Sequence, residues 1–125
     1  MSSKKKILVI QPVHDLGMEL LINNPNFEYE TTNDTSENNL KSKIVNFDGV
    51  SVRTAILNKD IINEAKNLKI ISRHGVGYDN IDLPKAKEKG IQLAITANAN
   101  AVTVAEHVMF MLLNLSKKKD MYDKT

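Results

Sequence analysis

The stretch Ile7-Leu8-Val9-Ile10 is an uninterrupted run of branched apolar residues near the start of the chain. A strand with one face in solvent alternates apolar and polar residues, whereas a strand of a parallel sheet with both faces covered is apolar throughout. The run therefore predicts a strand buried on both faces within a parallel sheet.

Downstream, short strand-like runs alternate with amphipathic helical segments. Further strands are expected at 27–31, 50–52, 69–72 and 91–95, and helices at 16–22, 34–45, 58–68, 84–90 and 101–118. Asn58 and Asp82 are placed to cap two of these helices, and Pro84 suits a first helical turn. Strict alternation of strand and helix predicts an α/β fold, a flavodoxin-like doubly wound five-stranded parallel sheet with helices on both faces, plus a long C-terminal helix.

Composition removes several classes of function. The chain has 125 residues and a mass of 14.0 kDa, which is one domain, and its net charge of +2 argues against a nucleic-acid binder. It has no Cys, which excludes disulfides and thiolate sites, and its three His show no metal-ligand spacing. No apolar run suits a membrane helix or a signal peptide, so a soluble, cytoplasmic protein without a membrane partner is expected.

Ligands of doubly wound folds bind at the carboxyl ends of the strands. The chain has fifteen Lys but only two Arg, and both Arg53 and Arg73 fall at such ends. The planar guanidinium holds carboxylate or phosphate in two parallel bonds, which Lys cannot do. Each Arg therefore either contacts an acidic substrate or serves as a solvated or structural ion-pair residue.

The turn Gly75-Val76-Gly77 follows the fourth expected strand and begins like a dinucleotide-binding fingerprint. The third Gly is missing, Asp79 would face a pyrophosphate, and no acidic residue follows about 20 residues later. We therefore exclude a loop for NAD phosphates. The turn either aims backbone N–H groups at a small anion or is a plain tight turn.

The last expected helix combines a polar pair with an apolar surface. Glu106 and His107 are either an acid–base pair or, as is more usual on a helix, a hydrogen-bonded structural pair. The apolar residues that follow, 108–113 and Leu115, cover nearly its whole circumference. A sheet can cover only one side of such a helix, so the rest needs another domain or subunit.

Three motifs resemble those of one enzyme family. Segment 73–82 reads Arg-His-Gly-Val-Gly-Tyr-Asp-Asn-Ile-Asp and resembles the R-x-G-V-G-x-D-N-I-D block of the D-isomer-specific 2-hydroxyacid dehydrogenases. Residues 51–54 resemble their V-R-[ST] strand end, and Asn100 with 104–107 resembles their N-x-x-x-V-A-E-H hinge. Their order and spacing span essentially the whole chain, and the likeness is greatest to the D-3-phosphoglycerate dehydrogenase group. Before Asn100 the family usually has Thr-Pro-Gly, which this chain lacks.

The resemblance implies that residues 1–100 form a substrate-binding (catalytic) domain. Residues 101–125 would be a hinge helix leading to an NAD-binding Rossmann domain absent from this chain. The reaction implied is NAD-dependent oxidation of 3-phosphoglycerate in serine biosynthesis. The family's catalytic Arg, Glu and His would lie outside this chain, so no residue here is catalytic and the chain alone should be inactive.

The resemblance also implies site residues. Backbone groups of Val76 and Gly77 would hold the substrate carboxylate, Arg53 would contact the substrate, and Asn100 would lie beside it at the hinge. Val76 and Val104 would approach the nicotinamide end of NAD. A homodimer through the last helix is expected, because the dimer contacts of the family commonly involve it.

Two other classes of protein share parts of this pattern. A signalling receiver domain would need an acidic pair, an Asp and a Lys where this chain has 11–13, Arg53 and 96–97, so that class is disfavoured. A stand-alone module that binds small anions or a partner, without catalysis, stays open.

Overall fold

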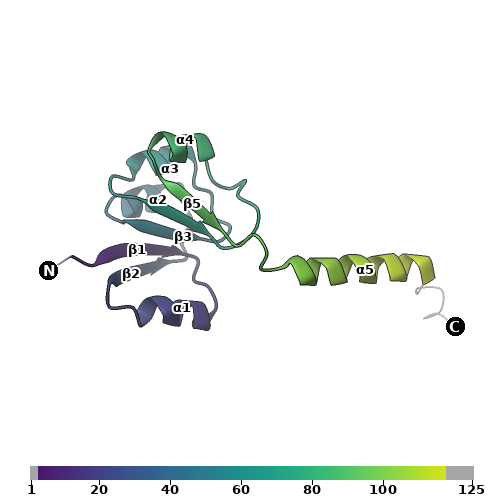
Figure 1. Ribbon diagram of the computed structural model, residues 1–125. Coiled ribbons are helices and arrows are strands. Elements are labelled where there is room, and N and C mark those ends of the chain that lie inside the picture. The colour runs from purple at the N-terminus through teal and green to yellow at the C-terminus, as the bar shows by residue number, and fades with distance from the viewer. Residues whose placement is uncertain (1–2, 118–125) are drawn as a thin grey trace.

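The computed structural model describes residues 3–117 and shows alternating strands and helices (Figure 1). The strands are β1 (Lys5–Ile10), β2 (Phe27–Thr32), β3 (Gly49–Val52), β4 (Ile70–Arg73) and β5 (Gln92–Ile95). The helices are α1 (Asp15–Ile22), α2 (Glu37–Ile44), α3 (Lys59–Glu64), α4 (Leu83–Glu88) and α5 (Ala101–Lys117). Every predicted element is present, and most bounds differ from those expected by a residue or two. Residue 118, the expected end of the last helix, lies outside the described range.

The five strands form one parallel sheet in the order β2-β1-β3-β4-β5. The chain first moves from β1 to one edge, then crosses back beyond β1 and continues to the other edge. Right-handed crossovers consequently place the first helix and the later helices on opposite faces. The predicted flavodoxin-like fold is confirmed.

The main core lies between the sheet and helices α2, α3 and α4. Its fully buried members come from alternate strand positions, from α2 and α3 and, at Leu57, from the loop before α3: Leu8, Ile10, Leu40, Ile44, Val50, Val52, Leu57, Ile61, Ile62 and Ile71. Val9 is equally buried but stands outside this cluster. The Ile7–Ile10 run therefore does lie in a strand covered on both faces.

Two helices contribute no buried side chain. Helix α1 lies on the other side of the sheet beside β2, with Leu16 and Leu20 exposed. Helix α5 projects away from the sheet (Figure 1) and buries none of its residues. The expectation that the sheet covers one side of the last helix is thus wrong, because the turn over 97–100 leads the chain away from the sheet instead of back across it.

Two helices are shorter than predicted, for local reasons. Helix α2 begins at Glu37 and not at Asp34, since the Asp34 carboxylate accepts a hydrogen bond from the Ser36 N–H (2.9 Å) in a turn before the helix. Helix α3 ends at Glu64 because Ala65 has an extended backbone (ψ 111°). Leu68 is buried as expected, but from the loop before β4. None of the helices within 3–117 is both long and apolar enough to span a bilayer.

Candidate functional site

The carboxyl ends of four strands lie level with one another at one edge of the sheet. Ile10 pairs with Val52, Val52 with Arg73, and Arg73 with Ile95. The loops that begin at the next residues therefore start side by side. This is the edge at which the sequence predicts a ligand site.

The loop after β4 is tied to both of its neighbours. The His74 N–H donates to the Val52 carbonyl of β3 (2.8 Å), and the Thr96 N–H beyond β5 donates to the Gly75 carbonyl (3.0 Å). The Gly75–Gly77 turn is thus held at the centre of this edge, between the loops that carry Arg53 and Asn100.

Arg73 folds back onto its own loop. Its Nη1 donates to the His74 carbonyl (2.8 Å), and its Nε is buried without a hydrogen-bond partner. Gly75 has a positive φ of 148°, and its missing side chain leaves the space that the guanidinium fills. Of the two alternatives for Arg73, this geometry favours a structural role, although its partner is a carbonyl and not the carboxylate of an ion pair.

Val76 and Gly77 present their backbone at the surface. Val76 is 40% exposed, and among residues 3–117 no atom accepts a hydrogen bond from the N–H of Val76 or Gly77. A Cβ on Gly77 would meet only the Asp79 carboxylate, at 3.7 Å, so the folded chain does not itself require Gly there. Two successive N–H groups without partners can bind a small anion.

Arg53 follows β3 directly and is exposed. Within the described residues its guanidinium makes no ion pair or hydrogen bond, which leaves it available to a ligand. The structure thus places Arg53 and the Gly75–Gly77 turn on adjacent strand ends.

Gln11 is a residue of this edge that the sequence analysis did not identify. Its side chain accepts hydrogen bonds from the N–H groups of Thr54 (2.9 Å) and Ala55 (3.0 Å), immediately beyond Arg53. A lone Gln after a strand carries no recognisable sequence signal, so only the tertiary contact identifies it.

Asn100 and Val104 lie at the start of α5, where both are exposed. The Val104 N–H donates to the Asn100 carbonyl (2.9 Å), which fixes the first helical turn. Further along, His107 stacks on Phe110 with ring centroids 6.2 Å apart. The described part of the chain shows no hydrogen bond between Glu106 and His107, so the structural pair favoured by the sequence analysis is not formed.

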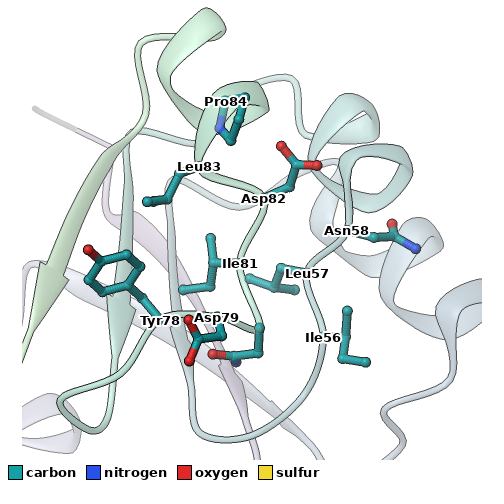
Figure 2. Close-up of a pocket in the computed structure, with 10 residues that line it drawn as sticks. Ile56, Leu57, Asn58, Tyr78, Asp79, Ile81, Asp82, Leu83 and Pro84 are labelled. Carbon is teal, nitrogen blue, oxygen red and sulfur yellow. The ribbon is translucent and has the colours of Figure 1, made fainter.

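A pocket of about 480 Å³ lies next to this edge, between the loop over 56–58 and the segment over 78–84 (Figure 2). The two segments are joined by hydrogen bonds from the Leu57 N–H to the Asn80 carbonyl (2.8 Å) and from the Asp82 N–H to the Leu57 carbonyl (3.0 Å). The charged lining residues are Asp79 and Asp82, and Asp82 caps α4 as predicted, through the Lys85 N–H (2.9 Å). A pocket whose charges are carboxylates does not suit an acidic ligand.

The side chains with shifted pKa values lie away from the candidate site. Within residues 3–117 the pKa values of Asp34 and Glu37 are lowered and that of Lys41 is raised, and all three residues lie in α2 or just before it. Residues 3–117 contain no group of three His, Asp or Glu side chains that could hold a metal ion. The candidate site therefore offers a cation and backbone donors, which bind an anion but do not by themselves transfer a proton.

Comparisons with known proteins identify the family of this chain. Residues 7–121 match the family profile described as D-isomer specific 2-hydroxyacid dehydrogenase, catalytic domain. A hydroxypyruvate reductase of Thermotoga maritima is 41% identical over 89% of this chain and 36% of its own length. A D-3-phosphoglycerate dehydrogenase of Archaeoglobus fulgidus is 31% identical over 96% of this chain and 23% of its own.

Solved structures of similar proteins share the fold of this chain. A Pyrococcus horikoshii protein superimposes with a TM-score of 0.80 at 30% identity, over 97% of this chain and 36% of its own. An NAD⁺-bound 3-phosphoglycerate dehydrogenase of Entamoeba histolytica has a TM-score of 0.77 at 28% identity, over 90% of this chain and 39% of its own. The chain thus spans little more than a third of these relatives, or less.

Proposed function

This chain belongs to the D-isomer specific 2-hydroxyacid dehydrogenase family and corresponds to its catalytic domain, and we propose that it binds the substrate at the edge formed by β3, β4 and β5. The backbone N–H groups of Val76 and Gly77 bind the carboxylate of the 2-hydroxy acid. Arg53, on the neighbouring strand end, binds the remainder of the substrate. Asn100 lies beside the substrate where the chain leaves this domain.

One observation is the main support for placing the substrate at this edge of the sheet. An unpaired, exposed guanidinium lies at the strand end next to a turn with two N–H groups that have no partner among residues 3–117. Both features bind anions, and the fold independently directs ligands to this edge. Arg73 takes no part in binding, because its guanidinium already packs against its own loop.

For the substrate we propose 3-phosphoglycerate, whose phosphate would pair with Arg53. Several relatives carry the name D-3-phosphoglycerate dehydrogenase, among them two at 31% and 37% identity. The relative at 41% identity is named a hydroxypyruvate reductase, and its substrate has the carboxylate without the phosphate. The phosphate is thus the group that distinguishes the two candidates.

The family implies NAD as the cofactor, and the Entamoeba relative was crystallised with it. The described residues do not fit its pyrophosphate: the Gly75–Gly77 turn does not open a helix, since α4 begins only at Leu83. The side chains of Val76 and Val104 are exposed and apolar and suit packing against a nicotinamide ring, and this is the single contact with NAD that we assign to them. When bound, the nicotinamide supplies the hydride chemistry, and the residues of this chain hold and orient the acid.

We propose that residues 1–100 are the substrate-binding unit and that 101–125 lead toward an NAD-binding domain, which the family implies. Residues 118–125 of this segment lie outside the described range. The projecting position of α5 supports a connecting role, because this helix contributes nothing to the core beneath the sheet (Figure 1). On this proposal dehydrogenation also needs the catalytic Arg, Glu and His that the family implies, and we expect residues 1–125 on their own to bind the acid without oxidising it.

We also propose that two copies associate through α5. The chain exposes 8938 Å², whereas a compact protein of 14.0 kDa exposes about 6,700 Å². The excess, about 2,200 Å² for one chain, is larger than the roughly 800 Å² that each partner buries in a stable interface of standard size. Large apolar residues along α5 account for part of it, and they are about half exposed or more: Val102, Val104, Val108, Met109, Phe110, Met111, Leu112, Leu113 and Leu115.

Calorimetric titration of the 125-residue chain tests the substrate site. We expect 3-phosphoglycerate to bind more tightly than D-glycerate or hydroxypyruvate, and Arg53→Ala to remove that preference while leaving weak binding of the carboxylate. Equal affinities of the wild type and Arg53→Ala for all three acids would exclude Arg53 from the site.

The alternative is a stand-alone anion-binding module without catalysis. Its site would be the same, so ligand titration does not separate the two. The reading frame after Thr125 does: a glycine-rich dinucleotide-binding segment there supports the dehydrogenase, and a stop codon supports the module.

A further inference from the structure

We propose that Gln11 is a positioning residue that fixes the backbone from which Arg53 extends. The inference rests on the proposed function for the use made of Arg53, but its structural part stands on its own contacts. Gln11 directly follows β1, and its φ of 62° is the single positive value of a non-glycine residue within 3–117. A residue with a Cβ adopts this conformation only where its surroundings hold it there, often at functional sites.

The side chain of Gln11 connects the ends of two strands. Its Oε1 accepts from the N–H groups of Thr54 (2.9 Å) and Ala55 (3.0 Å), and its Nε2 lies 3.0 Å from the Thr54 Oγ1. Its own N–H donates to the Thr32 carbonyl (2.8 Å), which continues the pairing of β1 with β2. One carboxamide thus joins segments 43 residues apart at the carboxyl edge of the sheet.

Hydrogen bonds from Gln11 and from His74 hold the two peptide units on either side of Arg53. The Thr54 N–H belongs to the peptide that follows Arg53, and Gln11 holds it. The Val52 carbonyl belongs to the peptide that precedes Arg53, and the His74 N–H holds it (2.8 Å). Because the Arg53 guanidinium has no partner of its own in the described chain, these two peptides are what direct it toward a ligand.

The first test needs no ligand and uses amide hydrogen exchange in the whole chain. We expect Gln11→Asn to speed exchange at Thr54 and Ala55 at least about tenfold, because Asn tolerates a positive φ but is one methylene too short. Gln11→Glu should keep both amides protected, since a carboxylate accepts the same two bonds. The Lys69 amide, bonded to the Asp48 carbonyl, is the internal reference. Unchanged exchange at Thr54 and Ala55 in Gln11→Asn would overturn the inference.

The second test asks whether the effect passes through Arg53. We expect Gln11→Asn to weaken 3-phosphoglycerate binding about fivefold to tenfold, in line with small misplacements of a binding group. In an Arg53→Ala background the same change should cost nothing further. An equal loss in both backgrounds would show a general structural role and refute the positioning role.

A failure of the proposed function can be distinguished from a failure of the positioning role of Gln11. If the wild type binds none of the acids, the proposed function fails, while exchange at Thr54 and Ala55 and the backbone order parameter of Arg53 still report on Gln11. We then expect that order parameter to fall in Gln11→Asn and to stay at the wild-type value in Gln11→Glu. An unaltered value in Gln11→Asn would contradict the role of Gln11 whatever the ligand result.

Discussion

The guanidinium of Arg73 occupies the space that a side chain on Gly75 would need, with its Cζ 2.6 Å from the position of a Cβ there. The two residues therefore depend on each other within one loop. Gly75 allows Arg73 to fold back, and Arg73 in turn bonds the His74 carbonyl and packs under the turn that presents Val76 and Gly77.

Replacing Gly75 by Ala should destabilise the chain by about 1–3 kcal/mol, since it combines a strained φ with an overlap against Arg73. Urea unfolding measures the loss. In Gly75→Ala with Arg73→Ala the overlap is gone, so the double variant should lose less stability than the two single changes together. Additive losses would show that the two residues act independently.

Gly77→Ala should behave in the opposite way. The added methyl group meets only the Asp79 carboxylate at ordinary contact distance, so stability should change by no more than about 0.5 kcal/mol. Affinity for a 2-hydroxy acid should nevertheless fall at least about tenfold, because the methyl group obstructs the close approach of the carboxylate to the backbone. Gly77→Ala that binds as well as the wild type would place the anion elsewhere.

Sequence patterns were sufficient to predict the parallel sheet and the edge of the sheet at which the candidate site lies. The apolar run from Ile7 to Ile10 and the strand–helix alternation determine a parallel sheet, and right-handed crossovers then bring the ends of β3 and β4 together. The proximity of Arg53 to Gly75–Gly77 follows from this topology without knowledge of any side-chain contact.

Other features depend on contacts that one sequence cannot reveal. The bonds of Gln11 join residues far apart in the chain, and either Arg at a strand end could have folded back as Arg73 does. The apolar circumference of α5 predicts a helix that needs covering. It does not say where the helix goes, because what covers it is not the sheet of its own chain.

Lys89 provides a test of stability away from the candidate site. Its Nζ donates to the carbonyls of Ile62 (3.1 Å), Asn63 (2.7 Å) and Ala65 (2.6 Å) at the end of α3. The Ile62 carbonyl also accepts from the Ala65 N–H (3.2 Å), whereas among residues 3–117 the Asn63 and Ala65 carbonyls accept from the Lys89 ammonium alone. Lys89→Met should therefore cost about 1–2 kcal/mol in urea unfolding. Lys87→Met, an exposed change in α4 two residues before Lys89, should cost much less, and equal losses would argue that the three bonds contribute little.

Acid should weaken the fold partly through Glu37. The Lys41 ammonium, and then the Asn58 amide, lower the pKa of Glu37 below its ordinary value of 4.5, and Glu37 raises the pKa of Lys41 above 10.5. The carboxylate thus contributes stability above its unfolded pKa and loses it as the pH falls through the lower folded pKa. The Lys41 ammonium contributes stability below pH 10.5, and this contribution is lost as the pH rises through the higher pKa of Lys41 in the folded chain.

We accordingly expect Glu37→Gln to lose less stability than the wild type between pH 7 and pH 3 in urea unfolding. The difference should shrink in 1 M NaCl, because the pair is at the surface and salt screens it. Identical pH profiles of the two proteins at low salt would contradict the assignment.

Helix α5 should mediate self-association without stabilising the sheet. Leu112 is 56% exposed and α5 buries none of its side chains, so Leu112→Glu should leave urea unfolding of the chain nearly unchanged. An unpaired charge in an apolar interface is costly, and the same change should weaken dimerisation at least about tenfold in sedimentation equilibrium. Ser116→Glu adds the same charge one turn further along and should keep the wild-type association. A wild type that stays monomeric at high concentration, or dimers that tolerate Leu112→Glu, would mean that something other than a second α5 covers this helix.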